Sequence, residues 1–175
     1  AVPIRYERKF FMLYNARNGI LTLDGATVHY LQFGKGEKHL IMIPGLGDGL
    51  KTAKGMALPV AYQYRAFAKA GYTVTLISRR EPLPEGYTTR DMAADLAACM
   101  EKLGILQADV LGVSQGGMIA QWLCIDHPEK VHRLILAVTT PTGNETLQAV
   151  VPRWMEMARQ GDYAALMLDT AEKSY

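Results

Sequence analysis

The protein is a chain of 175 residues, 49% of them hydrophobic, with a net charge of +2 at pH 7. This length can bury one good hydrophobic core, and the interspersed charges give no reason to expect a nucleic acid or a membrane surface as a partner. No apolar run is long enough to span a bilayer and the N-terminus has no apolar signal-peptide segment, so we expect a cytoplasmic protein.

The first elements of the chain are a leader and a hairpin. Ala1-Val2-Pro3-Ile4 resembles the tetrapeptide that apoptosis-inhibitor proteins capture, but four residues carry little information, and an ordinary leader over 1–19 is the better interpretation. Residues 20–33 predict a hairpin, because apolar residues alternate with polar ones and Asp24-Gly25 supplies the turn.

A glycine-rich loop, Pro44 to Gly49, follows a predicted buried strand over 39–43. The phosphate-binding loop and the dinucleotide fingerprint each require a glycine where Leu50 stands, so nucleotide binding is the weaker of two interpretations. The better one is a loop that brings backbone N–H groups close to Ser114.

The next segment predicts a helix over 59–70 and a strand over 72–78. A polar loop with prolines, residues 79–84, is expected after the strand. Its Arg79 and Arg80 would suit an anionic substrate, but a solvated loop paired with Glu81 is the favoured interpretation.

Thr88 to Asp91 has the pattern of a capping box, which predicts a helix that ends at Gly104. On this helix, Asp91 and Asp95 suggest an exposed face rather than a carboxylate site. Cys99 here and Cys124 further on fall on apolar helix faces without metal-ligand spacing, so we expect buried, reduced thiols.

The most informative segment of the chain is 109–120. Residues 110–113 form a short apolar run typical of a buried strand, Gly112 to Gly116 matches G-x-S-x-G with Ser114 at its centre, and 115–125 has apolar residues at helical spacing. A strand, a sharp turn with a serine and a helix are the context of a nucleophile elbow. The alternative is a serine in an ordinary strand-to-helix turn.

The rest of the chain continues the alternation of helix and strand. Pro128 predicts a helix end, and His127 and His132 lie on either side of a turn, which disfavours a metal pair. A buried strand over 131–139, an amphipathic helix over 144–160 and the start of another helix from Tyr163 follow.

This order of elements predicts an α/β fold, with a mainly parallel, doubly wound sheet that follows an N-terminal antiparallel hairpin. Ligands of such sheets bind beyond the carboxyl ends of the strands. The Pro44 loop and Ser114 both fall at that edge.

The chain resembles the N-terminal part of the α/β-hydrolase superfamily, of the lidded type that includes enol-lactonases, small-ester esterases and proline iminopeptidases. Three stretches carry the resemblance: Pro44 to Gly47, Gly112 to Met118, and Asp126 to Val131. It implies that residues 1–140 are the N-terminal portion of the hydrolase core and that 141–175 begin a helical lid.

The resemblance also implies a function. Ser114 would be the nucleophile, and the backbone N–H groups of Leu46 and Gln115 would form the oxyanion hole for a small ester, lactone or related acyl substrate. No cofactor or metal is implied, and the partner would be that small molecule.

The sequence departs from the family at three places. Pro44 stands where the family usually has histidine, and Ser78-Arg79-Arg80 lacks the usual Asp-x-Arg-Gly-x-Gly pattern. The family's acid and histidine follow the lid, beyond Tyr175. We therefore expect a missing C-terminal segment; the alternatives are a non-catalytic binding protein and a truncated, inactive fragment, which would self-associate.

Overall fold

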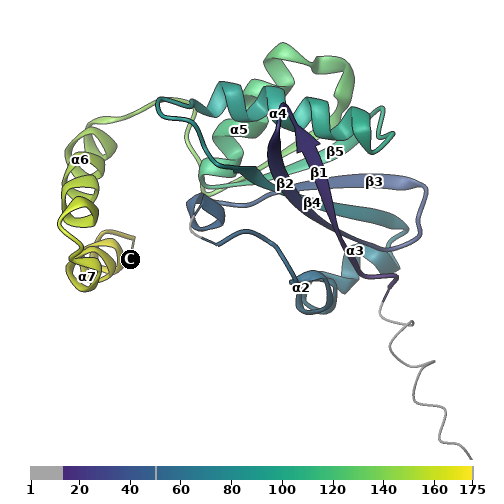
Figure 1. Ribbon diagram of the computed structural model, residues 1–175, viewed down its shortest axis with the longest axis horizontal. Coiled ribbons are helices and arrows are strands. Elements are labelled where there is room, and N and C mark those ends of the chain that lie inside the picture. The colour runs from purple at the N-terminus through teal and green to yellow at the C-terminus, as the bar shows by residue number, and fades with distance from the viewer. Residues whose placement is uncertain (1–13, 50, 175) are drawn as a thin grey trace, which may run out of the picture. The chain divides into compact units, whose positions relative to one another are not determined.

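The computed structural model describes residues 14–49 and 51–174 (Figure 1). They divide into two compact units, one up to Thr139 and one from Thr140 onward, and each is described by itself. Most of the expected leader, including the tetrapeptide at 1–4, lies outside the described residues.

The first unit is built on a six-stranded sheet with the order β1-β2-β4-β3-β5-β6. Pairing is antiparallel between β1, β2 and β4 and parallel between β4, β3, β5 and β6, which confirms the hairpin and the mainly parallel sheet. The strands are β1 (Arg17–Leu23), β2 (Ala26–Phe33), β3 (Lys38–Ile43), β4 (Tyr72–Glu81), β5 (Ala108–Val113) and β6 (Val131–Ala137).

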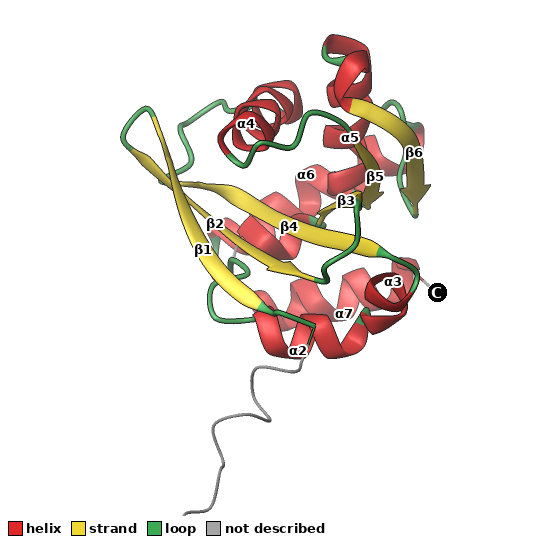
Figure 2. Ribbon diagram, turned by 90° about the vertical axis from the view of Figure 1, so that its right-hand side faces the viewer, coloured by secondary structure: helices red, strands yellow, loops and turns green. Residues whose placement is uncertain are grey.

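Helices cover both faces of this sheet, as Figure 2 shows. On one face, α4 and α5 pack on strand residues such as Ile41 and Val110; on the other, α2 packs on residues such as Leu40 and Val74. Successive residues of a strand point to opposite faces, so each strand supplies both cores. The helical elements are η1 (Leu46–Gly49), α2 (Ala57–Gln63), α3 (Arg65–Lys69), α4 (Thr89–Lys102), α5 (Gln115–Asp126) and η2 (Pro128–Lys130).

The helix expected over 59–70 is two helices, α2 and α3, because Tyr64 leaves the helical conformation with φ −103° and ψ 20°. Tyr64 and Phe67 pack against the same core cluster, and their rings stack with centroids 6.5 Å apart. The two short helices thus cover one face of the sheet together. The segment ends at Gly71, whose φ of +85° suits a glycine.

Strand β4 is three residues longer than expected, and the interpretation of Arg79 to Glu81 as a solvated loop is wrong. Arg80 and Glu81 pair with β2, opposite Val28 and Thr27. Both arginines have nearby carboxylates, Asp48 for Arg79 and Asp95 for Arg80. These partners offset the cost of bringing the two charges into the sheet.

Helix α4 begins at the predicted capping box: Thr88 is the N-cap, and its side chain and that of Asp91 bond each other's backbone N–H. Asp95 is not on an exposed face: its side chain is only 16% exposed, and Arg80 donates to both of its carboxylate oxygens at 2.7 Å. Cys99 is buried and burial raises the pKa of its thiol to about 12, whereas Cys124 is only half-buried.

The second unit contains α6 (Glu145–Arg159) and α7 (Tyr163–Ser174). Asn144 caps α6 by accepting from the backbone N–H of Leu147. The indole of Trp154 donates to the buried Asp169 carboxylate at 2.8 Å, which joins the two helices. Across the part of the chain that the structure describes, no helix combines the length and the apolar character that crossing a membrane requires.

Candidate active site

Ser114 occupies the turn between β5 and α5, and its side chain is exposed. Its backbone has φ 53° and ψ −123°, a region that residues with a Cβ rarely adopt. Three hydrogen bonds hold it there: its N–H donates to Ala137 at 2.9 Å, and its carbonyl accepts from Gly117 at 2.9 Å and from the Thr139 hydroxyl at 2.7 Å. The predicted sharp, strained turn is therefore present.

Glycines are required around this turn because backbone passes where their side chains would be. A Cβ on Gly112 would lie 2.5 Å from the carbonyl oxygen of Gly116, and one on Gly116 would lie 2.1 Å from that of Ile43. Real Cβ atoms do not approach this closely. The predicted role of both glycines, to let strand and helix meet, is confirmed.

The Pro44 loop lies against Ser114, as predicted. A Cβ on Gly45 would lie 3.4 Å from the Ser114 Cβ and 3.9 Å from its Oγ, so the Gly45 backbone lies close to the Ser114 side chain. Leu46, the next residue, begins η1, and its side chain is exposed. The structure thus brings together the segments of all three predicted site residues.

Gln115 is the first residue of α5, where backbone N–H groups have no acceptor within the helix. The positive end of the helix dipole adds to their attraction for negative charge. An oxygen that gains charge beside Ser114 would therefore meet a favourable field. Among the described residues no group of histidine, cysteine and acidic side chains could hold a metal ion.

A buried polar network under this edge was missed by the sequence interpretation. The Arg79 backbone N–H donates to Asp48 at 2.8 Å, and Nη2 of its guanidinium donates to the Pro44 carbonyl at 2.7 Å and to Gln115 Oε1 at 3.0 Å. Burial lowers the pKa of the Arg79 guanidinium, and the nearby Asp48 carboxylate opposes that shift. Ser78 also donates to Asp48, at 2.8 Å.

One sequence signal could have found this network. Asp48 stands within an otherwise apolar glycine loop. Arg79 follows an apolar strand that lies beside the strand before this loop in a parallel sheet. Asp48 also places a buried carboxylate in the loop that was considered for nucleotide phosphates, which argues against that alternative.

The described histidines take no part in a catalytic pair with Ser114. His29, His127 and His132 each lie within 4 Å of a carboxylate, from Glu81, Glu129 and Asp109 respectively. His39 has a buried Nδ1 without a hydrogen-bond partner. Among the hydrogen bonds of the described residues, none joins the Ser114 hydroxyl to a histidine.

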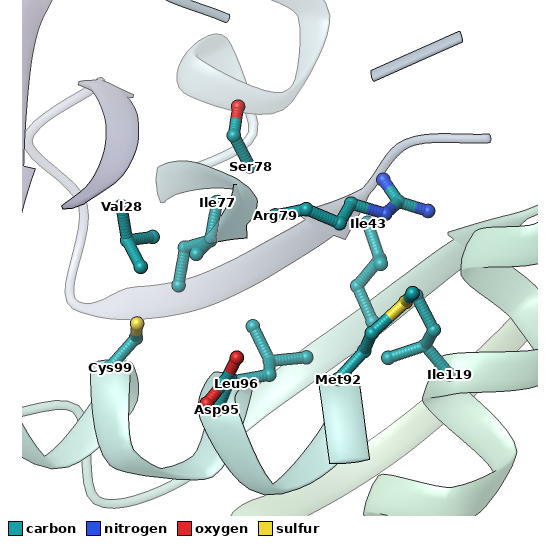
Figure 3. A pocket seen from close by; sticks show the side chains of 10 residues that line it. All are labelled: Val28, Ile43, Ile77, Ser78, Arg79, Met92, Asp95, Leu96, Cys99 and Ile119. Atoms are coloured by element: carbon teal, nitrogen blue, oxygen red, sulfur yellow. The ribbon is translucent and has the colours of Figure 1, made fainter. Parts of the chain in front are cut away.

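A small internal cavity between β4 and α4 is not a substrate site (Figure 3). Its volume of about 20 Å³ leaves room for roughly one water molecule. Cys99, Leu96 and Asp95 line it from α4, and the Arg79 guanidinium extends toward Ile43 rather than toward Cys99 (Figure 3).

Comparisons with known proteins agree with this architecture. A family model described as alpha/beta hydrolase fold matches residues 38–175. A 2-hydroxy-6-oxononadienedioate/2-hydroxy-6-oxononatrienedioate hydrolase from Pseudomonas sp is 32% identical over 135 residues, which are 70% of this chain and 46% of that protein. The 3-oxoadipate enol-lactonase 2 of Acinetobacter baylyi is 27% identical over 146 residues, 81% of this chain and 52% of that one.

The chain thus spans about half the length of these relatives. Among solved structures, a hydrolase from Pseudomonas aeruginosa PA01 matches with a TM-score of 0.62 and 24% identity, over 82% of this chain and 56% of that chain. That likeness concerns the fold. On the family match and the sheet order together, the protein belongs to the α/β-hydrolase superfamily.

Proposed function

We propose that the protein is a serine hydrolase that acts on a small ester, lactone or related acyl compound, with Ser114 as its nucleophile. The observation that carries the proposal is the positive φ of an exposed serine at a strand-to-helix turn, with the Pro44 loop packed against it. The name of the enol-lactonase relative supports a lactone or ester as substrate.

In the proposed reaction, Ser114 Oγ bonds to the substrate carbonyl carbon while its proton passes to a general base. The carbonyl oxygen becomes an oxyanion, which accepts hydrogen bonds from the backbone N–H groups of Leu46 and Gln115. Each such donor typically contributes on the order of 3 kcal/mol to the transition state. The carbon–oxygen bond to the leaving group then breaks, the leaving group takes the proton, and water releases the acyl group from Ser114.

We propose that the base, a histidine, and its acidic partner follow residue 175 in the full-length protein. In this fold their order along the chain is serine, acid, histidine. The proposal rests on the absence of a histidine bonded to Ser114 among the described residues and on longer relatives, of which the match covers only about half. Residues 141–175 would begin the helical lid. The free thiols Cys99 and Cys124 suit a cytoplasmic enzyme.

The lack of a histidine beside Ser114 also supports a second candidate, a hydrolase-like protein that binds a small molecule without turnover. Replacement of Ser114 distinguishes the two. With short-chain esters and lactones as substrates for the full-length protein, Ser114→Ala abolishes turnover but retains binding if the first is correct. Turnover that survives the replacement would contradict the first, and measurable ligand binding without any turnover by the parent protein would favour the second.

A further inference from the structure

The Arg79 guanidinium is buried at the carboxyl edge of the sheet, directly under the proposed site. Resting on the proposed function, we propose that Arg79 is a positioning residue: held beside Asp48, it fixes the spacing of the two oxyanion-hole donors by bonding to both segments that carry them. Nη2 alone donates to the Pro44 carbonyl, two residues before Leu46, and to the side chain of Gln115.

A bulge in β4 aims Arg79 at these two segments. Val28 of β2 pairs with Arg80, and Tyr30 pairs with Ile77, so that His29 alone stands opposite two β4 residues, Ser78 and Arg79. Bulges of this kind redirect a side chain and occur beside active sites. The extra residue lets Arg79 reach along the strand ends to Pro44 and Gln115.

The adjacent Arg80 shows the hydrogen bonds expected of an arginine whose role in this sheet is structural. Arg80 donates from Nε and Nη2 to both oxygens of Asp95, the two-pronged geometry that best suits a guanidinium and a carboxylate. Arg79 does not pair with Asp48 in this way. Its Nη1 lies 3.5 Å from Asp48, and Nε and Nη1 are buried without a hydrogen-bond partner.

The position of Arg79 is therefore not the two-pronged one that pairing with a carboxylate alone would select. The orientation of Arg79 instead lets Nη2 donate two hydrogen bonds, one to the Pro44 carbonyl and one to Gln115 Oε1. The Asp48 side chain, which is only 4% exposed, lies beside the Arg79 guanidinium and offsets its charge. Arg79 is therefore a poor site for an anionic substrate. The anionic-substrate interpretation of the two arginines is therefore not supported by the geometry of either.

Asp48 completes the connection between the strand and the loop. Its carboxylate accepts from Ser78 Oγ and from the Arg79 backbone N–H, while its own N–H donates to the Gly45 carbonyl at 3.2 Å. The loop that carries the Leu46 N–H is thus tied to β4 at Asp48 and at Pro44. The elbow is tied to the same arginine through Gln115.

The test compares two double variants of the full-length protein that each remove a buried ion pair. Arg79→Met with Asp48→Asn removes the positioning contacts without leaving an unpaired charge, and Arg80→Met with Asp95→Asn is the matched control on the neighbouring residue. For a short-chain ester, we expect kcat of the first to fall roughly 10- to 100-fold, since a misplacement of about 1 Å in a reacting group costs that much. KM should change less than about threefold, because ground-state binding does not depend on the oxyanion hole.

The control should retain kcat within about threefold even where its melting temperature falls, because Arg80 contacts neither donor segment. Equal losses of kcat in both variants, or an unchanged kcat in the first, would overturn the proposal. Hydrogen exchange of the amides of residues 45–48 gives a second readout that needs no turnover: it should accelerate in the first variant only.

These readouts separate the two proposals. If the parent protein shows no turnover that depends on Ser114, the proposed hydrolase function fails, and amide exchange alone decides the role of Arg79. Faster exchange at 45–48 in the Arg79 variant but not in the Arg80 variant would still support the positioning role. Identical exchange in both variants would refute it.

Discussion

Gly116→Ala tests whether the elbow depends on direct backbone contact between α5 and β3. The added Cβ would lie 2.1 Å from the Ile43 carbonyl oxygen and 2.6 Å from that of Pro44, while ordinary Cβ contacts begin near 3.4 Å. The helix and the strand must therefore separate by about 1 Å. Both obstructing atoms are backbone, so no side-chain rotamer relieves the contact.

Overpacking of this kind costs 1–3 kcal/mol and occasionally more, and because only backbone can move we expect a loss of roughly 3 kcal/mol in the free energy of unfolding. For a protein of this size that corresponds to a melting temperature lower by about 6–12 °C. The same displacement moves the Pro44 loop relative to Ser114, so ester hydrolysis by the full-length protein should fall about 100-fold.

Thermal melts and steady-state kinetics measure the two effects, with Gly143→Ala as the control. Gly143 has only the Gln148 side chain near, at 4.0 Å, and should tolerate a methyl group. A Gly116→Ala protein with parental stability and activity would refute the contact argument. So would a Gly143→Ala protein that is equally destabilised.

Three further predictions follow from the same structure. Leu46→Pro removes a backbone N–H, together with the exposed leucine side chain, at the first position of η1, where proline is tolerated. The kcat for ester hydrolysis should fall about 100-fold with an unchanged far-UV spectrum, and an unaffected kcat would exclude this N–H as a donor. The Trp154 indole, assisted by Arg153 and Lys173, holds the pKa of Asp169 below its usual value, so α6–α7 stability is fully present above the unfolded pKa of about 3.9 and falls as the pH drops through the folded pKa. Tryptophan fluorescence during acid titration measures this, and an Asp169→Asn variant with the same acid transition would contradict it. A fragment of residues 1–175 should self-associate in light scattering, because β6 pairs only with β5 among the described residues and Ile135 and Leu136 are each 44% exposed; a monomeric, stable fragment would contradict this.

The sequence predicted those parts of the fold whose causes are local. The G-x-S-x-G pattern, the capping box at Thr88 and the Asp24-Gly25 turn each act within a few residues, and all three have the expected geometry. The turn, for example, needs positive φ at both positions, and the two residues have φ of 47° and 83°.

What the sequence interpretation missed depends on partners distant along the chain. The sequence favours a solvated loop at Arg79 and Arg80, because the carboxylates that partner them, Asp48 and Asp95, lie 31 and 15 positions away along the chain. For the same reason Asp95 read as an exposed residue of a helix face. Charged side chains are assigned to the surface by default, and only the three-dimensional structure shows that both arginines belong to β4 and have carboxylate partners on η1 and α4.

The most direct test of the central claim is the intact mass of the full-length protein before and after treatment with a fluorophosphonate probe. If Ser114 is an activated nucleophile, the folded protein gains one adduct, the Ser114→Ala protein and the denatured protein gain none, and the untreated mass exceeds that of residues 1–175. A folded full-length protein that gains no adduct, or an adduct that persists in Ser114→Ala, would contradict the claim.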